Sequence, residues 1–579
     1  MVIAMCYNFI NIYERKNGMK KIISLSLILI MLLTAVTPVF SLAASQEQVT
    51  PIVYIRGNGE PIYNAQGEEV VADIGKISLG GDEDEEKTKD KIVEAVVNIL
   101  LPFLTEGLIF DNWDNYGRAI YDEISPLFAE AILDGNGDPQ YGTGVPESVI
   151  EKSEQIASKD QFKGGKYDFY AYMFRFDWRL DPYEHVDRLH EYIKTVLKAT
   201  KKSQVSLAAR CLGGSVLTAY LEKYGKEGLI KNVMFCDVLS EGCTVISKGF
   251  SGQIDFDSKS IQRYVGQLDF CDEIGFGVGF GIPLLADEIV TKTLDLFTQV
   301  GVVDALSGSI EELYGKLYKA LIPALFHSFG YASQPIYWTF VEEEDFDRAL
   351  NLMFGEEGSE ARTYFAGLIE KINNYREKII TNRDRLFETF TEDYGIHMGV
   401  IAKYGLLNPP FVTGYNELSD GLASLEDSSF GATCANVGSV LSEEYISSRV
   451  AAGKGDYISP DKCVDTSTGL FPETTWVIKN VHHDDFDRSG KALAEKFLSG
   501  SGVTVENSGF ARFRINDYST NTVADMTEDN CADLEWISLP EEKPTTETRL
   551  ASLMRFLTMI LDFITKLIKG EIDLGNLFG

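Results

Sequence analysis

Basic residues are scarce in this chain. Its 579 residues include 53 Lys and Arg against 87 Asp and Glu, which gives a formal net charge of −34 at pH 7. A surface this acidic repels the phosphates of nucleic acids, and it repels anionic lipid headgroups in the same way. We therefore expect no nucleic-acid partner.

Histidine is also rare, and the common metal-binding patterns are missing. The sequence holds six histidines, of which His482 and His483 are adjacent, and it has no Cys-x-x-Cys pair. Adjacent histidines do not match the spacings with which proteins usually bind zinc. The glycine-rich stretch 275–281 (GFGVGFG) lacks the spacing and the following acidic residue of a dinucleotide-binding loop. The sequence therefore predicts no metal and no cofactor.

A secretory leader is the first feature that is present. Residues 19–44 begin with Met-Lys-Lys, continue as an apolar run and end in Ala43 and Ala44. This pattern is typical of a signal peptide that is cleaved near 43–45, and residues 1–18 then read as a misplaced start. The competing interpretation is a membrane anchor, but the apolar run is short and small residues follow it. We expect a secreted protein, with association to the cell surface as a further option.

Removal of the leader leaves an odd number of cysteines. Seven remain, at positions 211, 236, 243, 271, 434, 463 and 531. An odd count leaves at least one thiol unpaired in a secreted protein. If the other six form three disulfides, Cys211 is the unpaired one; in a reducing environment all seven stay free.

Strand and helix patterns alternate along two parts of the chain. Apolar strand patterns and helical spacing occur in turn at 51–57, 167–180, 185–199, 205–209, 212–224, 231–239, 396–402 and 474–481. This alternation is typical of an α/β fold with a mainly parallel sheet flanked by helices.

The middle of the chain interrupts that alternation. Helical patterns dominate residues 251–395, and insertions of this size commonly form a cap or lid over a binding site. The predicted core therefore has a first part, 45–250, and a second part, 396–490. A C-terminal extension, 491–540, and a linker with an amphipathic helix, 541–579, follow it.

The predicted C-terminal helix has an apolar face that can be interpreted in two ways. Residues 550–568 carry apolar side chains over about half of the helix circumference. That face either packs on the body of the protein or lies on a lipid surface or a partner.

Residues 205–214 (VSLAARCLGG) carry the most chemical information. A strand pattern leads into Cys211, and a helical pattern begins directly after it. A nucleophile held at the tip of such a sharp turn needs small residues two positions before and two positions after it, and Ala209 and Gly213 supply them. Gly214 then allows the helix to pack closely on the sheet. The thiol of Cys211 is a competent nucleophile if a base or the positive end of the helix favours its thiolate.

A nucleophile of this kind works with an oxyanion hole made of two backbone N–H groups. The first candidate donor is Leu212, directly after the nucleophile. The second should come from the loop that follows the first strand, 56–59 (RGNG), and Asn58 is the candidate there.

The remaining catalytic partners should follow in the order nucleophile, acid, histidine. His483 follows the strand pattern 474–481 and is the preferred base, with His482 as the alternative. The acid should lie one strand earlier. Asp456, in a Gly-Asp turn, is the preferred acid, with Asp461 and Asp465 as alternatives.

These motifs resemble the lecithin:cholesterol acyltransferase-like, lipase-like branch of the α/β-hydrolases. In that branch a Tyr-Asp-Trp-Arg strand end precedes a helix and a His-Ser-Met-Gly-Gly elbow, and 167–225 has FDWRL followed by ARCLGG. IRGNG resembles the oxyanion loop of that branch, and GKGDYISP resembles its acid turn. The resemblance covers 51–245 and 395–490. It implies an α/β-hydrolase fold with a large helical cap insertion, acting on acyl esters or other lipid-like substrates.

Three residues of the elbow depart from that branch. Cys211 stands where the family has serine, Arg210 where it has histidine, and Ala209 where it has glycine. The Cys-Leu-Gly-Gly string resembles the elbow of polyhydroxyalkanoate synthases, which use cysteine. The leading hypothesis is a secreted esterase, lipase or acyltransferase with a Cys-His-Asp triad and a covalent acyl-enzyme. The alternative is a catalytically inactive hydrolase-fold protein that binds a ligand, a surface polymer or a protein.

Overall fold

The structure is a computed structural model. It describes residues 49–57, 60–70, 110–239, 242–253, 311–410, 412–520 and 522–534, with isolated positions at 98, 102, 105–107, 260, 263–264 and 267. Several predicted features lie outside the described residues: the leader and the stretch before it (1–44), Asn58, 275–281 and the helix at 550–568.

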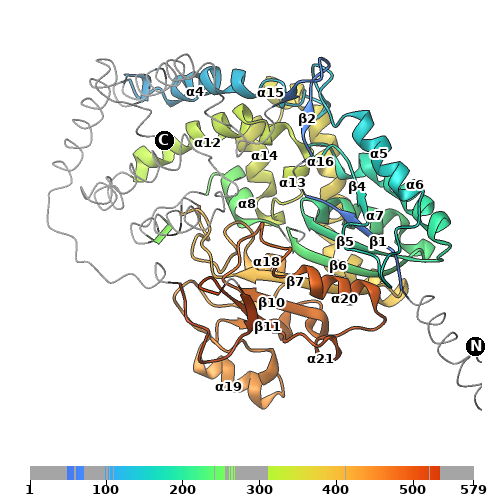
Figure 1. The fold of residues 1–579 in the computed structure, drawn as a ribbon. Helices are drawn as coiled ribbons and strands as arrows, with labels where there is room; N and C mark the ends of the chain where they lie inside the picture. Colours follow the sequence, from blue (N-terminus) through green and yellow to red (C-terminus); the bar gives the residue numbers. More distant parts are fainter. Residues whose placement is uncertain are drawn as a thin grey trace, which may run out of the picture.

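An eight-stranded sheet forms the centre of the molecule (Figure 1). Its strands run in the order β12-β11-β10-β7-β6-β5-β1-β4, and each neighbouring pair is parallel except β11–β12. The strands span Ile52–Ile55 (β1), Tyr172–Phe174 (β4), Val205–Cys211 (β5), Ile230–Val238 (β6), His397–Tyr404 (β7), Thr475–Lys479 (β10), Phe513–Asp517 (β11) and Thr522–Asp525 (β12). The predicted α/β architecture with a mainly parallel sheet is confirmed.

The two faces of this sheet are covered by different helices. Side chains alternate along each strand, so Ile52 and Tyr54 of β1 enter one core while Val53 and Ile55 enter the other. Helix α20 (Lys491–Ser499) covers the first face. Helices α6 (Pro182–Thr200) and α7 (Gly213–Tyr224) cover the second. The sheet is therefore buried on both faces, as its near-continuous apolar strands require.

Local sequence explains where α6 begins and ends. The Asp181 side chain accepts a hydrogen bond from the Tyr183 backbone N–H, and Pro182 occupies the first turn, where its missing N–H costs nothing. Lys201 ends the helix in a left-handed conformation, with φ of 56°. The strand predicted at 167–180 is shorter than expected. The Asp168 side chain accepts a hydrogen bond from the Tyr170 N–H and closes a turn there, so only β4 is extended.

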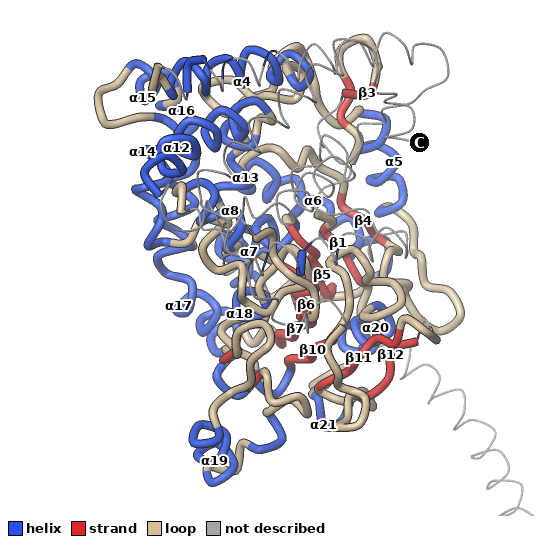
Figure 2. Tube along the Cα trace, turned by 90° about the vertical axis from the view of Figure 1, so that its left-hand side faces the viewer, coloured by secondary structure: helices blue, strands red, loops and turns tan. Residues whose placement is uncertain are grey.

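The described part of the insertion is helical. It contains α12 (Glu311–Ser328), α13 (Pro335–Trp338), α14 (Phe346–Phe354), α15 (Glu360–Tyr364), α16 (Ala366–Lys378) and α17 (Arg383–Glu388). In Figure 2 most of these helices gather at one end of the molecule, with β10–β12 toward the other. Helix α4 (Trp113–Phe128) packs closely on α12, since a Cβ on Gly117 would lie 2.9 Å from the Ala320 carbonyl oxygen.

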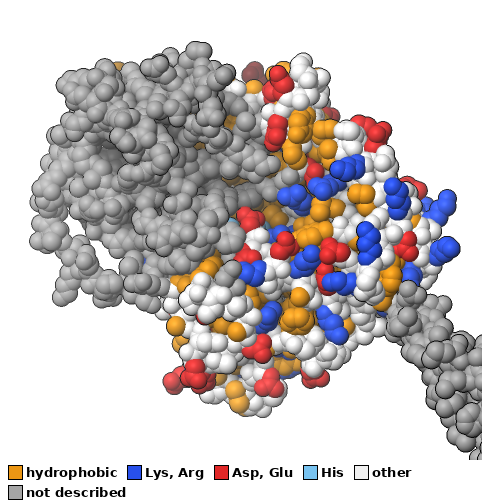
Figure 3. Space-filling view, viewed as in Figure 1, with side chains coloured by type: hydrophobic (Ala, Val, Ile, Leu, Met, Phe, Trp, Pro, Cys, Tyr) orange, Lys and Arg blue, Asp and Glu red, His pale blue; other side chains and the backbone are white. Residues whose placement is uncertain are grey.

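Charges of both signs are mixed on the described surface, and the described cysteines form no disulfides. On the face drawn in Figure 3, basic and acidic side chains are interspersed over the part of the chain that the structure describes. The six described cysteines are all free thiols: Cys211, Cys236, Cys243, Cys434, Cys463 and Cys531. Among the described residues, no helix combines the length and the hydropathy needed to cross a bilayer.

Candidate active site

Cys211 occupies a strained strand-to-helix turn. It is the last residue of β5, its φ is +49°, and α7 begins two residues later. A non-glycine residue seldom adopts this conformation, and such strain clusters at functional sites. The residue is half-buried, and its thiol is free of any disulfide.

The chain leaves no room for larger residues around this turn. A Cβ on Gly57 would lie 2.8 Å from the Cys211 Cβ, and a Cβ on Gly213 would lie 2.4 Å from the Ile55 carbonyl oxygen. Ala209 is fully buried, and Gly214 is buried in the first turn of α7. These small residues let the end of β1 pass directly beside the turn.

The predicted oxyanion donors are placed in part. Leu212 is buried, and its backbone nitrogen would lie 3.4 Å from a Cβ on Gly57, so it borders the loop after β1. Asn58 lies outside the described residues. Ser215, one helical turn beyond Cys211, is buried and shares a 2.7 Å hydrogen bond with the Thr339 hydroxyl. Ser215 is therefore held by the insertion rather than by a histidine.

His483 is the imidazole next to Cys211. Its Nδ1 lies 2.8 Å from Asp420 Oδ2, and its backbone N–H donates to the Asp420 carbonyl oxygen at 3.0 Å. Its Nε2 is buried and makes no hydrogen bond of regular geometry with any described residue. Burial opposes protonation, but the Asp420 carboxylate, together with the charge of Cys211 in its thiolate form, raises the pKa of His483 well above its ordinary value.

Asp420 is the carboxylate bonded to His483, and sequence reasoning missed it. The side chain is buried, and its Oδ1 accepts hydrogen bonds from the Leu422 and Ala423 N–H groups at 3.1 and 2.8 Å. Although burial favours the neutral acid, His483 and Lys403 hold the pKa of Asp420 below its ordinary value. The sequence feature that could have identified Asp420 is the Ser-Asp-Gly turn at 419–421, in the loop that follows β7.

The structure places the three predicted acids away from His483. Asp456 is exposed in a short turn. Asp461 accepts a hydrogen bond from the Tyr404 hydroxyl and pairs with Lys479 at 2.9 Å. Asp465 pairs with Arg449 at 2.8 Å. Asp461 and Asp465 hold loops together, and none of the three is bonded to an imidazole.

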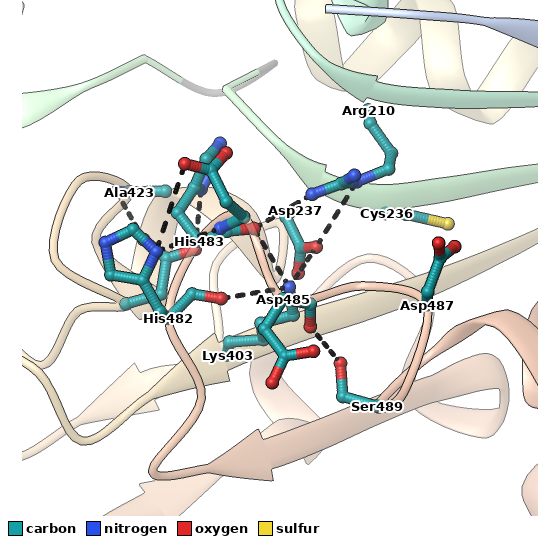
Figure 4. Close-up of polar contacts among 12 residues, drawn as sticks. Arg210, Cys236, Asp237, Lys403, Ala423, His482, His483, Asp485, Asp487 and Ser489 are labelled. Carbon is teal, nitrogen blue, oxygen red and sulfur yellow. Dashed lines mark hydrogen bonds and ion pairs between the residues drawn. The ribbon is translucent and has the colours of Figure 1, made fainter. Parts of the chain in front are cut away.

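His482 lies on the same loop but has other surroundings. Its Nδ1 accepts a hydrogen bond from the Asp484 N–H at 3.2 Å. Burial lowers the pKa of this imidazole, which opposes protonation. In Figure 4 His482 and His483 lie on one loop, close to Lys403.

One group of carboxylates in the described residues has the spacing of a metal site, but a lysine occupies its centre. Oxygens of Glu342, Glu344 and Asp345 lie within 4.8 Å of one another. The Lys248 ammonium lies 2.7, 3.1 and 2.8 Å from them, in that order. The Lys248 ammonium therefore balances the negative charge of these carboxylates in the place that a metal ion would take.

Comparisons with known proteins add little to this geometry. No protein-family model matches the chain, and no curated protein matches it. Among solved structures, the crystal structure of the Tle4-Tli4 complex is similar over 61% of this chain and 75% of that chain, with 12% sequence identity and a TM-score of 0.23. A likeness this low bears on neither the fold nor the chemistry.

The arrangement has the parts needed for nucleophilic catalysis. A thiol at a strained turn lies beside an imidazole, and a buried carboxylate orients the other nitrogen of that imidazole. These three groups are the components of a nucleophile, base and acid triad.

Proposed function

We propose that the chain is an α/β-hydrolase-fold enzyme that cleaves or transfers acyl esters through a Cys211-His483-Asp420 triad. The observation that supports it best is the position of Cys211, at a strand-to-helix turn with φ of +49°, next to an imidazole held by Asp420 at 2.8 Å. Strained elbows of this kind present the nucleophile in α/β-hydrolases.

The proposed reaction has two halves. His483 takes the proton of the Cys211 thiol as Sγ attacks the acyl carbon. The bond from the acyl carbon to the alcohol oxygen then breaks, and His483 passes the proton to that oxygen, which leaves a thioester on the enzyme. Water then gives a proton to His483 and attacks the thioester, which releases the carboxylic acid and restores the thiol. An alcohol in place of water would give acyl transfer. Asp420 stabilises the imidazolium, and Leu212 with Asn58 would donate to the oxyanion.

The substrate and location follow from the resemblance described above. We propose an acyl ester or lipid-like substrate, as in the lecithin:cholesterol acyltransferase-like branch. A secreted enzyme is the matching proposal for location, and the helix at 550–568 keeps its two interpretations, packing on the protein body or contact with a lipid surface or a partner.

Covalent trapping tests the proposal. Iodoacetamide at substoichiometric dose should modify Cys211 before the other thiols, and mass spectrometry of the digest would identify the site. Cys211→Ala should abolish hydrolysis of p-nitrophenyl butyrate, whereas Cys531→Ala, which removes another half-buried thiol, should keep it. Full activity in Cys211→Ala would refute the assignment. Selective labelling without turnover of any ester would favour the alternative, a hydrolase-fold binding protein.

A further inference from the structure

The residue before the proposed nucleophile contacts the loop that carries the proposed base. Alternation along β5 directs Arg210 and Cys211 to opposite faces of the sheet. The Arg210 guanidinium donates from Nη2 to the backbone carbonyl oxygen of His483 at 2.9 Å, and it lies over the Phe486 ring at 4.8 Å. One side chain therefore links the nucleophile strand to both ends of the segment 483–486.

A buried lysine binds the same carbonyl group. Lys403 of β7 is fully buried, and its ammonium lies 3.1 Å from the His483 carbonyl oxygen and 3.4 Å from that of His482. Asp237, at the end of β6 with φ of +51°, balances the charge: its Oδ2 lies 2.5 Å from Lys403 Nζ and 3.8 Å from Arg210 Nε. Figure 4 shows Asp237 between Arg210 and Lys403, beside the loop that carries His482 and His483.

These contacts leave His483 few ways to move. Its N–H and its Nδ1 are bonded to Asp420, and its carbonyl oxygen is bonded to two cations. Nε2 is the polar atom that remains for the Cys211 thiol. Since Arg210 and Cys211 are neighbours in the chain, a shift of the His483 backbone away from the nucleophile would lengthen the Arg210 hydrogen bond.

We propose that Arg210 is a positioning residue for this site: with Lys403 and Asp237 it forms a buried ion triad that fixes the His483 backbone relative to Cys211. The inference rests on the proposed function. It explains why a charged residue stands at a crowded position directly before the nucleophile. Charge-assisted hydrogen bonds to a buried carbonyl are among the stronger ones, and a small misplacement of a catalytic base costs a large factor in rate.

The experiment compares Arg210→Met and Arg210→Lys with Arg514→Met. Arg514 of β11 is the matched control, because its guanidinium likewise donates to backbone carbonyls, those of Ser489 and Val523, but contacts neither His483 nor the Lys403–Asp237 pair. We expect Arg210→Met to lower kcat for p-nitrophenyl butyrate by at least about 10-fold, with KM changed much less. Alkylation of Cys211 by iodoacetamide should slow in parallel. Arg210→Lys should recover part of both rates, and Arg514→Met should change neither.

A second measurement is independent of turnover. The downfield proton resonance of His483 Nδ1–H, assigned by its loss in His483→Gln, should broaden or disappear in Arg210→Met and persist in Arg514→Met. An unchanged resonance and unchanged rates in Arg210→Met, at a thermal midpoint like that of Arg514→Met, would overturn the inference. If the wild-type protein neither turns over the ester nor labels at Cys211, the proposed function fails, and the resonance alone decides whether Arg210 positions His483.

Discussion

At the scale of single residues, the site depends on how one carboxylate is held. Asp420 Oδ1 is occupied by two backbone N–H groups of its own turn, which leaves Oδ2 for His483. The side chain is buried, so its negative charge acts on the imidazole with little screening by water. This geometry fixes which nitrogen of His483 carries the proton and which one meets the thiol.

Replacing Asp420 by Asn should therefore change the pH dependence of Cys211 chemistry. Without the carboxylate the pKa of His483 falls, so the imidazolium that favours the thiolate is lost at lower pH. We expect kcat to drop by at least about 100-fold. The pH of half-maximal alkylation by iodoacetamide, measured from pH 5 to 9, should rise by about one unit. Asp456→Asn is the matched control, since Asp456 is an exposed aspartate that is not bonded to His483, and it should leave both quantities unchanged.

The positions of the proposed nucleophile and the proposed base were predictable from sequence, because each stands at the end of a strand or within a few residues of it. Cys211 ends β5, and His483 lies four residues after β10. The position of the acid was not predictable from sequence, because the loop between β7 and β10 is long and contains several aspartates in turns. Only the folded loop shows that Asp420 returns to the sheet edge while Asp456 stays in solvent.

At the scale of elements, the strand edge next to the site is held by buried charge. Lys479, the last residue of β10, is almost fully buried, and its ammonium lies 2.9 Å from Asp461 and 2.7 Å from Asp533. It also donates to the Cys531 carbonyl oxygen at 2.7 Å. Lys479 thereby fastens two loops to the end of the strand that leads to His483.

Lys479→Met should destabilise the fold strongly. It leaves the buried Asp461 without its cation, and breaking one partner of a buried pair typically costs about 3–5 kcal/mol. Differential scanning fluorimetry should show a clear drop in the thermal midpoint. Lys491→Met provides the comparison, because Lys491 pairs with Asp168 at the surface, and it should change the midpoint little. Equal effects of the two substitutions would show that the Lys479 cluster contributes no more than a surface pair.

At the scale of the whole molecule, the insertion and the sheet share one core. Trp338 and Phe340 are buried with strand residues such as Phe235, and the Cys243 N–H donates to the Phe340 carbonyl oxygen at 3.0 Å. The sequence indicated a helical insertion, and the described part is helical. Its apolar spacing did not reveal which side chains reach the core, because that depends on contacts with residues about 100 positions earlier in the chain.

The excess of carboxylates over basic groups affects the stability of the whole molecule, because some of these carboxylates are buried. Burial raises the pKa of Glu417 to about 7, with neighbouring carboxylates of Asp427 and Glu342 adding to the rise, and burial raises that of Asp181 to about 6. Between the ordinary carboxyl pKa and these values the folded chain holds protons that the unfolded chain has released. The contribution of these two carboxyl groups to stability therefore falls as pH rises through this window.

Glu417→Gln should reduce the loss of stability that occurs as pH rises. The amide oxygen can still accept the hydrogen bond from Thr244, which is 2.6 Å long in the structure, but no charge forms as pH rises. We expect the variant to be more stable than the wild type by about 1–3 kcal/mol at pH 8 and nearly equal to it at pH 4.5. Thermal midpoints from pH 4.5 to 8 would measure the difference. Glu357→Gln, in an exposed turn after α14, should follow the wild-type curve throughout. An advantage of Glu417→Gln that is the same at every pH would show that packing, and not the buried charge, is responsible.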